Sequence, residues 1–310
     1  MSSDLILASL ILWLAAAVAG LARKGKFSRA LLVLGGIPAM VAAVLSLPEG
    51  IVAVRIPLGM DPQGSLYRLD PAALWLMGFG LPGAVLASAV GTTSRRSAGW
   101  AFGAAVSLIG AMGVFGLQDA VSFLVAWELM SLGGAVMLLG EDLARERGRP
   151  ILFMLALLEA GAVALILAML LLADGSGDIS FSGFAAALSG MGEYEQLFIG
   201  LLLLIGFGAK LGLLPFYEWF PGAYGTGSGA TGAIMSGVVL NAAFFGLGRA
   251  FLDWFPPGIG DPLSVSGIFV VAVAVLSAIL TALYAFQQEG WRELLSLSSA
   301  ENGSIAVCLL

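Results

Sequence analysis

Long apolar runs recur along this chain, and they limit its possible folds more than any other feature of the sequence. A run of about 18 or more apolar residues can cross the hydrocarbon core of a bilayer as a helix. Such runs lie near residues 5–22, 30–48, 71–93, 99–117, 119–140, 151–173, 197–214, 230–252, 264–286 and 293–310. Because 59% of the residues are hydrophobic and only 11% are charged, a soluble domain of this length is excluded. The sequence therefore predicts an all-α protein, a polytopic transmembrane helical bundle of about ten spans.

Basic residues are divided unequally between the two sides of this predicted bundle. If the spans alternate in direction, one side carries Arg23, Lys24, Lys26, Arg29, Arg95, Arg96, Arg145, Arg147, Arg149 and Arg292. The other side carries Arg55, Arg68 and Arg249. Since Lys and Arg are enriched in cytoplasmic loops, the first side is predicted to be cytoplasmic and the N-terminus to lie outside.

The outer segment between the second and third spans, near residues 49–70, has alternating apolar and polar residues on either side of a turn. The turn former is Asp61-Pro62-Gln63-Gly64, which favours a short β-hairpin. Asp70 directly precedes Pro71, the pairing expected where a helix begins.

The seventh run, LFIGLLLLIGFGAKLGLL, carries a single lysine, Lys210, and is followed by Pro215. An unpaired charge inside the membrane costs at least about 2.5 kcal/mol, so Lys210 needs a carboxylate or water beside it. Pro215 has no N–H and its ring displaces a carbonyl of the preceding turn, which predicts a discontinuous helix near the lysine. The alternative is a helix that ends at the interface, with Lys210 extending its stem outward to water.

Two carboxylates lie inside other spans. Glu128, in the fifth, is roughly 14 Å from the outer face, and Glu159, in the sixth, is roughly 20 Å from it, as is Lys210. Groups at matched depth can share protons, because mutual attraction favours charge and burial opposes it. Either carboxylate could instead be a structural group without a role in transport.

Four segments resemble one family in order and spacing. WELMSL surrounds Glu128, FGAKLGLLPFYEWFPGAY surrounds Lys210, SGVVLN lies in the eighth span and SLSSAEN in the tenth. Together they resemble the antiporter-like, proton-translocating membrane subunits of complex I and of energy-converting hydrogenases. The pattern Ser298 to Asn302 looks most like the large membrane subunit of hydrogenase-4 and formate hydrogenlyase.

The resemblance implies a fourteen-helix fold of two inverted repeats, of which the chain would cover about the first ten helices. The implied organisation is an N-terminal part, 1–98, a five-helix proton-channel repeat, 99–252, and an incomplete start of the second repeat, 253–310. It also implies that Glu128 and Lys210 form a proton-relay couple in a prokaryotic plasma membrane. The chain would be a fragment, a subunit split between two polypeptides, or a degenerate relative.

This chain also departs from the family pattern. Asn241 stands where relatives carry a lysine or histidine, and an amide cannot store a proton near pH 7. Tyr217 and Tyr224 stand where histidines are usual, and the chain has no His. Glu301, in the tenth span, is a relay position or part of a structural polar cluster. Glu159, Asn241 and Glu301 are the further relay candidates beside the couple.

The function predicted from these residues is ion transport without a redox centre in this chain. The single Cys308 excludes an intramolecular disulfide and most metal clusters, and no cofactor is predicted. Partners would be other membrane and peripheral subunits of a redox complex, with protons or Na⁺ as the ion and no nucleic acid. The alternatives are an Mrp-type Na⁺/H⁺ antiporter component and a scaffold subunit that no longer pumps.

Overall fold

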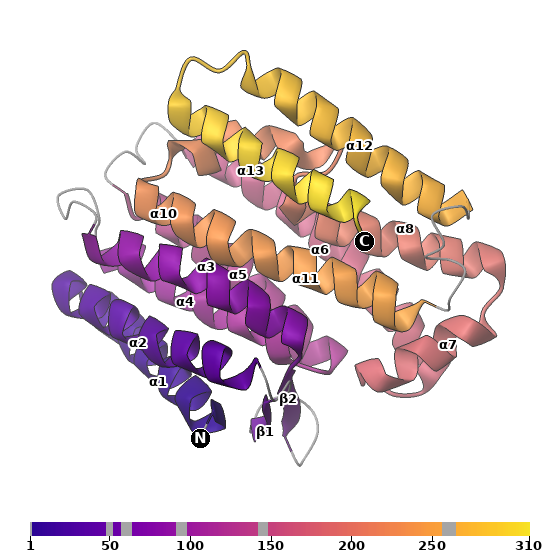
Figure 1. Cartoon of the computed structure of the whole chain (residues 1–310), viewed down its shortest axis with the longest axis horizontal. Coiled ribbons are helices and arrows are strands. Elements are labelled where there is room, and N and C mark those ends of the chain that lie inside the picture. The colour runs from indigo at the N-terminus through magenta and orange to yellow at the C-terminus, as the bar shows by residue number, and fades with distance from the viewer. Residues whose placement is uncertain (1, 48–51, 57–63, 91–97, 142–147, 256–264) are drawn as a thin grey trace.

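The computed structural model describes residues 2–47, 52–56, 64–90, 98–141, 148–255 and 265–310. Within these residues the chain is a bundle of long helices that lie side by side, from α1 and α2 at the lower left of Figure 1 to α12 at the top. The first helices are α1 (Ser2–Leu21), α2 (Gly25–Ser46), α3 (Pro71–Val90), α4 (Ala98–Gly116), α5 (Ala120–Leu139) and α6 (Gly148–Ser176). They are followed by α7 (Phe184–Gly190), α8 (Glu193–Leu211), α9 (Trp219–Gly222), α10 (Gly229–Ile234), α11 (Leu240–Arg249), α12 (Val265–Ala285) and α13 (Trp291–Cys308).

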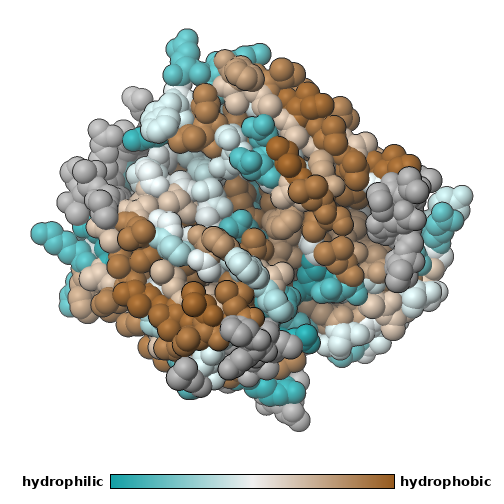
Figure 2. Space-filling view, viewed as in Figure 1, coloured by the Kyte–Doolittle hydropathy of each residue, from teal (hydrophilic) through white to brown (hydrophobic). Residues whose placement is uncertain are grey.

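Nine helical segments among the described residues are long and apolar enough to cross a membrane. The tenth predicted span is also a helix, α13, but it is more polar than the others because Arg292, Glu293 and Glu301 lie within it. Apolar side chains cover the outer faces of α12 and α2 in Figure 2. The prediction of a polytopic all-α bundle is therefore confirmed.

The predicted hairpin is present as β1 (Val52–Ile56) paired antiparallel with β2 (Ser65–Leu69). Asp70 accepts a hydrogen bond from the backbone N–H of Ala73 at 2.8 Å, which caps α3 as expected. The hairpin packs at the same end of the bundle as the start of α5 and the segment before α7. Gln118 N–H donates to Leu66 O at 3.1 Å, and Phe181 N–H donates to Gln118 O at 2.9 Å. These three segments fall on one side of the membrane in the predicted topology.

The predicted orientation leads to a direct test. A reporter fused after Arg147, which lies outside the described residues, should be cytoplasmic, because the basic residues of that side resist translocation. A reporter fused after Gly177, at the far end of α6, should be external. Paired activity of alkaline phosphatase and green fluorescent protein fusions measures both positions. Reversed locations for both would overturn the prediction that the N-terminus is outside.

Close backbone contact joins α4 and α5, the helix that carries Glu128. A Cβ atom added at Gly133 would lie 2.4 Å from Ser107 N, and one added at Gly103 would lie 2.2 Å from Met137 N. Backbone atoms cannot move aside as a flexible side chain can. Glycines at this contact therefore set the position of α5, in the way that small residues do in membrane bundles.

Replacing Gly133 by alanine should destabilise the protein by about 1–3 kcal/mol through overpacking. The matched control is Gly83→Ala in α3, where no atom lies within 4 Å of the added Cβ. In a helix this control should be neutral or slightly stabilising. Denaturant titration in mixed micelles measures both variants, and equal stabilities would show that the α4–α5 contact can relax.

Candidate functional site

The lysine-bearing helix α8 ends one residue after Lys210. Gly212 has a φ of 75°, a left-handed conformation that glycine adopts without strain, and its N–H donates to Gly208 O. A 3₁₀ turn, Phe216–Glu218, and the short α9 follow. The discontinuous helix near Lys210 is thus present, but the break occurs at Gly212 rather than at Pro215. Pro215 follows a cis peptide bond in the connection, beyond the end of the helix.

Side chains from other elements form hydrogen bonds with backbone groups that the break leaves unpaired. Trp219 Nε1 donates to Ala209 O at 3.0 Å, and Leu214 N–H donates to Ser277 Oγ of α12 at 2.9 Å. Membrane helices tolerate a break only where protein or water replaces the lost hydrogen bonds. These hydrogen bonds therefore stabilise the interruption inside the bundle.

Lys210 points into the protein and not toward the membrane surface. Its side chain is 1% exposed, and Nζ lies 4.1 Å from the centre of the Trp127 ring. Nζ also donates a hydrogen bond to Ser131 Oγ, whose own hydroxyl donates to Trp127 O at 2.9 Å. Both partners belong to α5, so the aromatic face and the hydroxyl replace part of the hydration of the ammonium. This placement excludes an extended lysine that reaches the interface.

The two membrane carboxylates lie together near this ammonium. Glu128 of α5 and Glu159 of α6 interact electrostatically with each other, and both interact with Lys210. Glu128 is half-buried and Glu159 is exposed on the surface of the chain. Two carboxyl groups that interact in this way repel each other when both are charged, and they can hold one proton between them. The structure therefore brings together an ammonium and a carboxyl pair that can carry different numbers of protons.

Asn241 and Glu301 are the remaining relay candidates. Asn241 Nδ2 donates to Gly237 O at 2.7 Å, within a span that is interrupted by a π-helical turn, Met235–Val239. Glu301 is half-buried on α13. In the described part of the chain, no hydrogen bond joins either side chain to Lys210, Glu128 or Glu159.

Several residues of the site were not found by sequence reasoning. Ser131 and Trp127 contact Lys210, and their positions three residues after and one residue before Glu128 were the available signal. Glu141 is 4% exposed and accepts hydrogen bonds from Ser228 N–H and from the Thr231 hydroxyl at the start of α10. These groups fix the orientation and the end of α5.

Arg249 was predicted on the outer side, near the end of the eighth span, and it is the last residue of α11 and 7% exposed. Its guanidinium donates to Phe115 O at 2.8 Å and to Leu117 O at 3.0 Å, where α4 ends. It also lies 4.5 Å from the centre of the Phe245 ring. Arg249 thus satisfies the free carbonyls of a helix C-terminus, which is a structural role.

A polar cavity of about 330 Å³ lies between the Gly-rich segment 225–232 and α13. Hydroxyl groups line much of it, from Tyr224, Ser228, Ser236, Ser296, Ser298 and Ser299. The hydroxyls of Tyr224 and Ser299 are 3.1 Å apart. Figure 2 shows polar and weakly polar residues over this part of the molecule. Tyr224, which stands where the resembling family usually has histidine, is therefore part of a polar lining.

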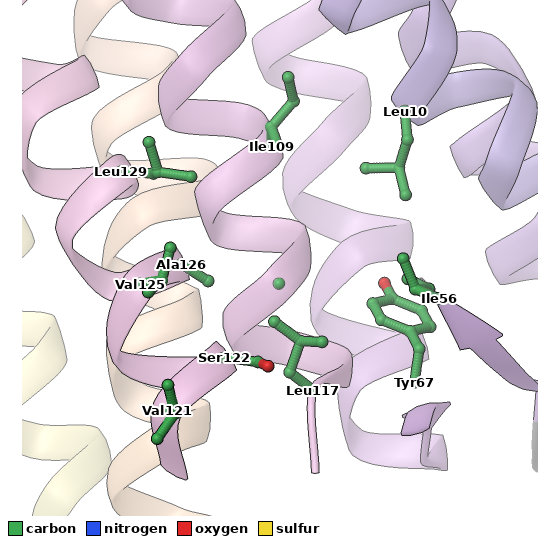
Figure 3. A pocket seen from close by; sticks show the side chains of 11 residues that line it. Leu10, Ile56, Tyr67, Ile109, Leu117, Val121, Ser122, Val125, Ala126 and Leu129 are labelled. Atoms are coloured by element: carbon green, nitrogen blue, oxygen red, sulfur yellow. The ribbon is translucent and has the colours of Figure 1, made fainter. Parts of the chain in front are cut away.

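A second cavity, of about 180 Å³, is apolar and lies near the hairpin (Figure 3). Leu10, Ile109, Val125 and Leu129 point into it from α1, α4 and α5. The Tyr67 hydroxyl donates to Met112 O at 3.0 Å, and burial raises the pKa of this phenol. Because Tyr67 therefore stays protonated and engaged, the cavity offers no proton carrier.

The fold and the site define a polytopic membrane protein with an interrupted helix and a buried lysine beside a carboxyl pair. The family model described as "NADH:quinone oxidoreductase/Mrp antiporter, TM" matches residues 118–307, and the chain belongs to this family. Hydrogenase-4 component B of Escherichia coli is 32% identical over 190 residues, which are 61% of this chain and 27% of that protein. NADH-quinone oxidoreductase subunit N of Deinococcus radiodurans is 31% identical over 265 residues, covering 81% of this chain and 53% of that protein.

Solved structures show the same fold at lower sequence identity. A subunit of an archaeal membrane-bound sulfane sulfur reductase superposes with a TM-score of 0.83 at 22% identity, covering 97% of this chain and 50% of that one. A subunit of respiratory complex I from Thermus thermophilus has a TM-score of 0.73 at 20% identity, covering 98% of this chain and 62% of that one. The chain thus spans between about a quarter and two thirds of the length of these proteins.

Proposed function

We propose that this chain is a proton-translocating membrane subunit of a hydrogenase-4 or complex I-like respiratory assembly. The observation that carries the proposal is Lys210, buried at the open end of an interrupted helix and facing two carboxyl groups. Intramembrane ionisable groups are costly, and they mark ion pathways in membrane proteins. The similar proteins named hydrogenase-4 component B and NADH-quinone oxidoreductase subunit N support the class of assembly.

Lys210 is the proton carrier in this proposal, with Glu128 as its countercharge. When Lys210 holds its proton, the Glu128–Glu159 pair balances the ammonium. When Lys210 releases the proton, Ser131 still hydrogen-bonds the neutral amine through its hydroxyl. A proton can therefore move among these groups without leaving a stranded charge, which keeps the barrier low.

The remaining candidates have lesser roles. Asn241 orients water without storing a proton, and Glu301 lies on the helix that borders the polar cavity. Residues 99–252 form the channel repeat, and 253–310 begin the second repeat. Partner subunits carry the redox chemistry, in a prokaryotic plasma membrane with the N-terminus of this chain outside.

The alternative function is Na⁺/H⁺ exchange as a component of an Mrp-type antiporter. The fold is compatible with this function, since a chain of the Mrp complex of Dietzia sp. superposes with a TM-score of 0.79 at 18% identity. The chemistry of the site favours protons, because the ammonium of Lys210 offers donors only and its positive charge repels Na⁺ from the oxygen atoms of the neighbouring carboxyl groups. A scaffold without transport is the third possibility, and the same experiment separates all three.

The test is proton flux in membrane vesicles that contain the assembled complex, followed with a pH-sensitive dye. Glu128→Gln should lower the initial rate of acidification by about 10²-fold, the lower range for loss of a positioned proton-transfer group. Asp178→Asn, at an exposed carboxylate beyond α6, is the matched control and should leave the rate unchanged. Flux that requires Na⁺ would favour the antiporter, and equal rates in all variants would favour a scaffold.

A further inference from the structure

A third cavity, of about 470 Å³, lies between the beginning of α2 and the end of α3. Both helix ends are at the left edge of the bundle in Figure 1, on the side predicted to be cytoplasmic. The lining includes Lys26, Arg29, Val33 and Leu34 of α2 and Ser88 of α3. The α2 residues have the spacing that places side chains on one face of a helix. One wall of the cavity therefore carries two cations and two apolar side chains.

The character of this wall changes with depth in the membrane. Because α2 begins at Gly25, Arg29 is roughly 6 Å from that end of the helix and Leu34 roughly 14 Å from it. The charged part therefore lies at the membrane surface and the apolar part lies within the hydrocarbon. A phospholipid has its phosphate and its acyl chains in the same order. A soluble anion would use only the charged part.

The two cations have hydrogen-bonding capacity that the described residues do not use. Lys26 is exposed and Arg29 is half-buried. Arg29 Nε donates to Gly25 O at 3.3 Å, but no described residue forms a hydrogen bond or ion pair with its terminal nitrogens or with the Lys26 ammonium. The Ser88 hydroxyl already donates to Ala84 O at 2.7 Å. The donors that remain for a ligand in this cavity are therefore the two cationic groups.

The surrounding helices supply no countercharge. Residues 5–48 and 71–118, which contain α1 to α4, include no Asp or Glu, and these four helices pack together. On the predicted cytoplasmic side, the same stretches carry six basic residues: Arg23, Lys24, Lys26, Arg29, Arg95 and Arg96. Basic clusters beside membrane spans attract anionic lipids. The charge at this corner of the bundle therefore favours an anionic ligand from the membrane.

We propose that this cavity binds an anionic phospholipid, with the lipid phosphate against Lys26 and Arg29 and one acyl chain along Val33 and Leu34. The Arg29 guanidinium supplies paired donors for phosphate oxygens, and the Lys26 ammonium adds a second positive charge. A zwitterionic lipid also brings a cation to the site, so it binds less tightly. No residue of this site belongs to the cluster around Lys210, so the proposal is independent of whether protons move through the chain.

The test is native mass spectrometry of the full chain in detergent, titrated with phosphatidylglycerol or phosphatidylcholine. The unchanged protein should bind phosphatidylglycerol about tenfold more tightly, since two cations face its phosphate. The double variant Lys26→Gln/Arg29→Gln should abolish this preference. Arg23→Gln/Lys24→Gln is the matched control and should keep it, because it removes the same charge from neighbouring exposed residues that do not line the cavity.

A second pair of variants tests the apolar part of the site. Val33→Phe fills space in the cavity and keeps both cations, so it should weaken the binding of phosphatidylglycerol by about threefold through lost acyl-chain burial. Val41→Phe, at a position of the same helix that is 41% exposed, is the control and should change binding little. Glycerol 3-phosphate has the charge without the acyl chains, and it should not displace the lipid at equal concentration.

A photoactivatable phosphatidylglycerol locates the site in the unchanged protein, without any substitution that could impair folding. Its adducts should lie on residues 26–34 of α2 or 84–89 of α3. Adducts confined to other helices would overturn the proposal. Equal loss of the lipid preference in both double variants would do so too, because it would indicate attraction by the general charge of this side. Displacement by glycerol 3-phosphate would indicate a site for soluble phosphates instead.

Discussion

Replacing both Glu128 and Glu159 by glutamine should destabilise the protein by about 3 kcal/mol, because it leaves Lys210 buried without a countercharge. The lysine is the deeply buried member of the cluster, and Ser131 and Trp127 replace only part of its hydration. Glutamine keeps the shape of both side chains, so the change removes charge and little packing. Denaturant titration in mixed micelles measures the loss.

The decisive comparison is the triple variant, in which Lys210→Met is added to the two glutamines. It should regain most of the lost stability, because no unpaired charge then remains in the bundle. The stability of the single variant Lys210→Met should lie between those of the double and triple variants. The two carboxylates that it leaves without a countercharge are only half-buried (Glu128) or exposed (Glu159). If the triple variant is no more stable than the double variant, the ammonium and the carboxyl pair are not coupled.

Much of the fold could be predicted from the chain because the bilayer imposes simple rules. Apolar runs gave the helices, and the Asp70–Pro71 pair correctly predicted the beginning of α3. Counting residues along three spans correctly placed Glu128, Glu159 and Lys210 near one another. Depth along a helix follows from a constant rise per residue, and it needs no knowledge of packing.

The features that could not be predicted depend on how each helix is rotated about its own axis and on the local conformation of the backbone. Proline is the stronger signal for a break, yet α8 ends at Gly212, whose left-handed conformation lets its N–H donate to Gly208 O. Whether Ser131 or another residue meets Lys210 depends on how α5 is turned about its axis. Glu159 was predicted at the same depth as Lys210, but its exposure on the surface of the chain could not be read from the sequence.

Glu141 is the clearest example of a residue whose importance becomes visible only in the structure. It lies two residues after the last residue of α5, and its carboxylate accepts from Ser228 N–H at 2.8 and 3.0 Å. It also accepts from the Thr231 hydroxyl. That hydroxyl in turn accepts from Trp100 Nε1 at 2.8 Å. Because the indole N–H can only donate, the proton of Thr231 is free to point toward Glu141. The carboxylate therefore ties the end of α5 to the beginning of α10 and to α4.

Glu141→Ala should therefore lower the free energy of unfolding by about 3 kcal/mol, because it removes the carboxylate that accepts from the half-buried Ser228 N–H and from the buried Thr231 hydroxyl. Glu141→Gln keeps one acceptor oxygen and should lose less than half as much. Glu289→Ala, at an exposed carboxylate, is the matched control and should be neutral. Proton flux should fall in Glu141→Ala as well, since α5 carries Glu128, Trp127 and Ser131 against Lys210. A variant that loses stability but keeps full flux would show that the site tolerates movement of this end of α5.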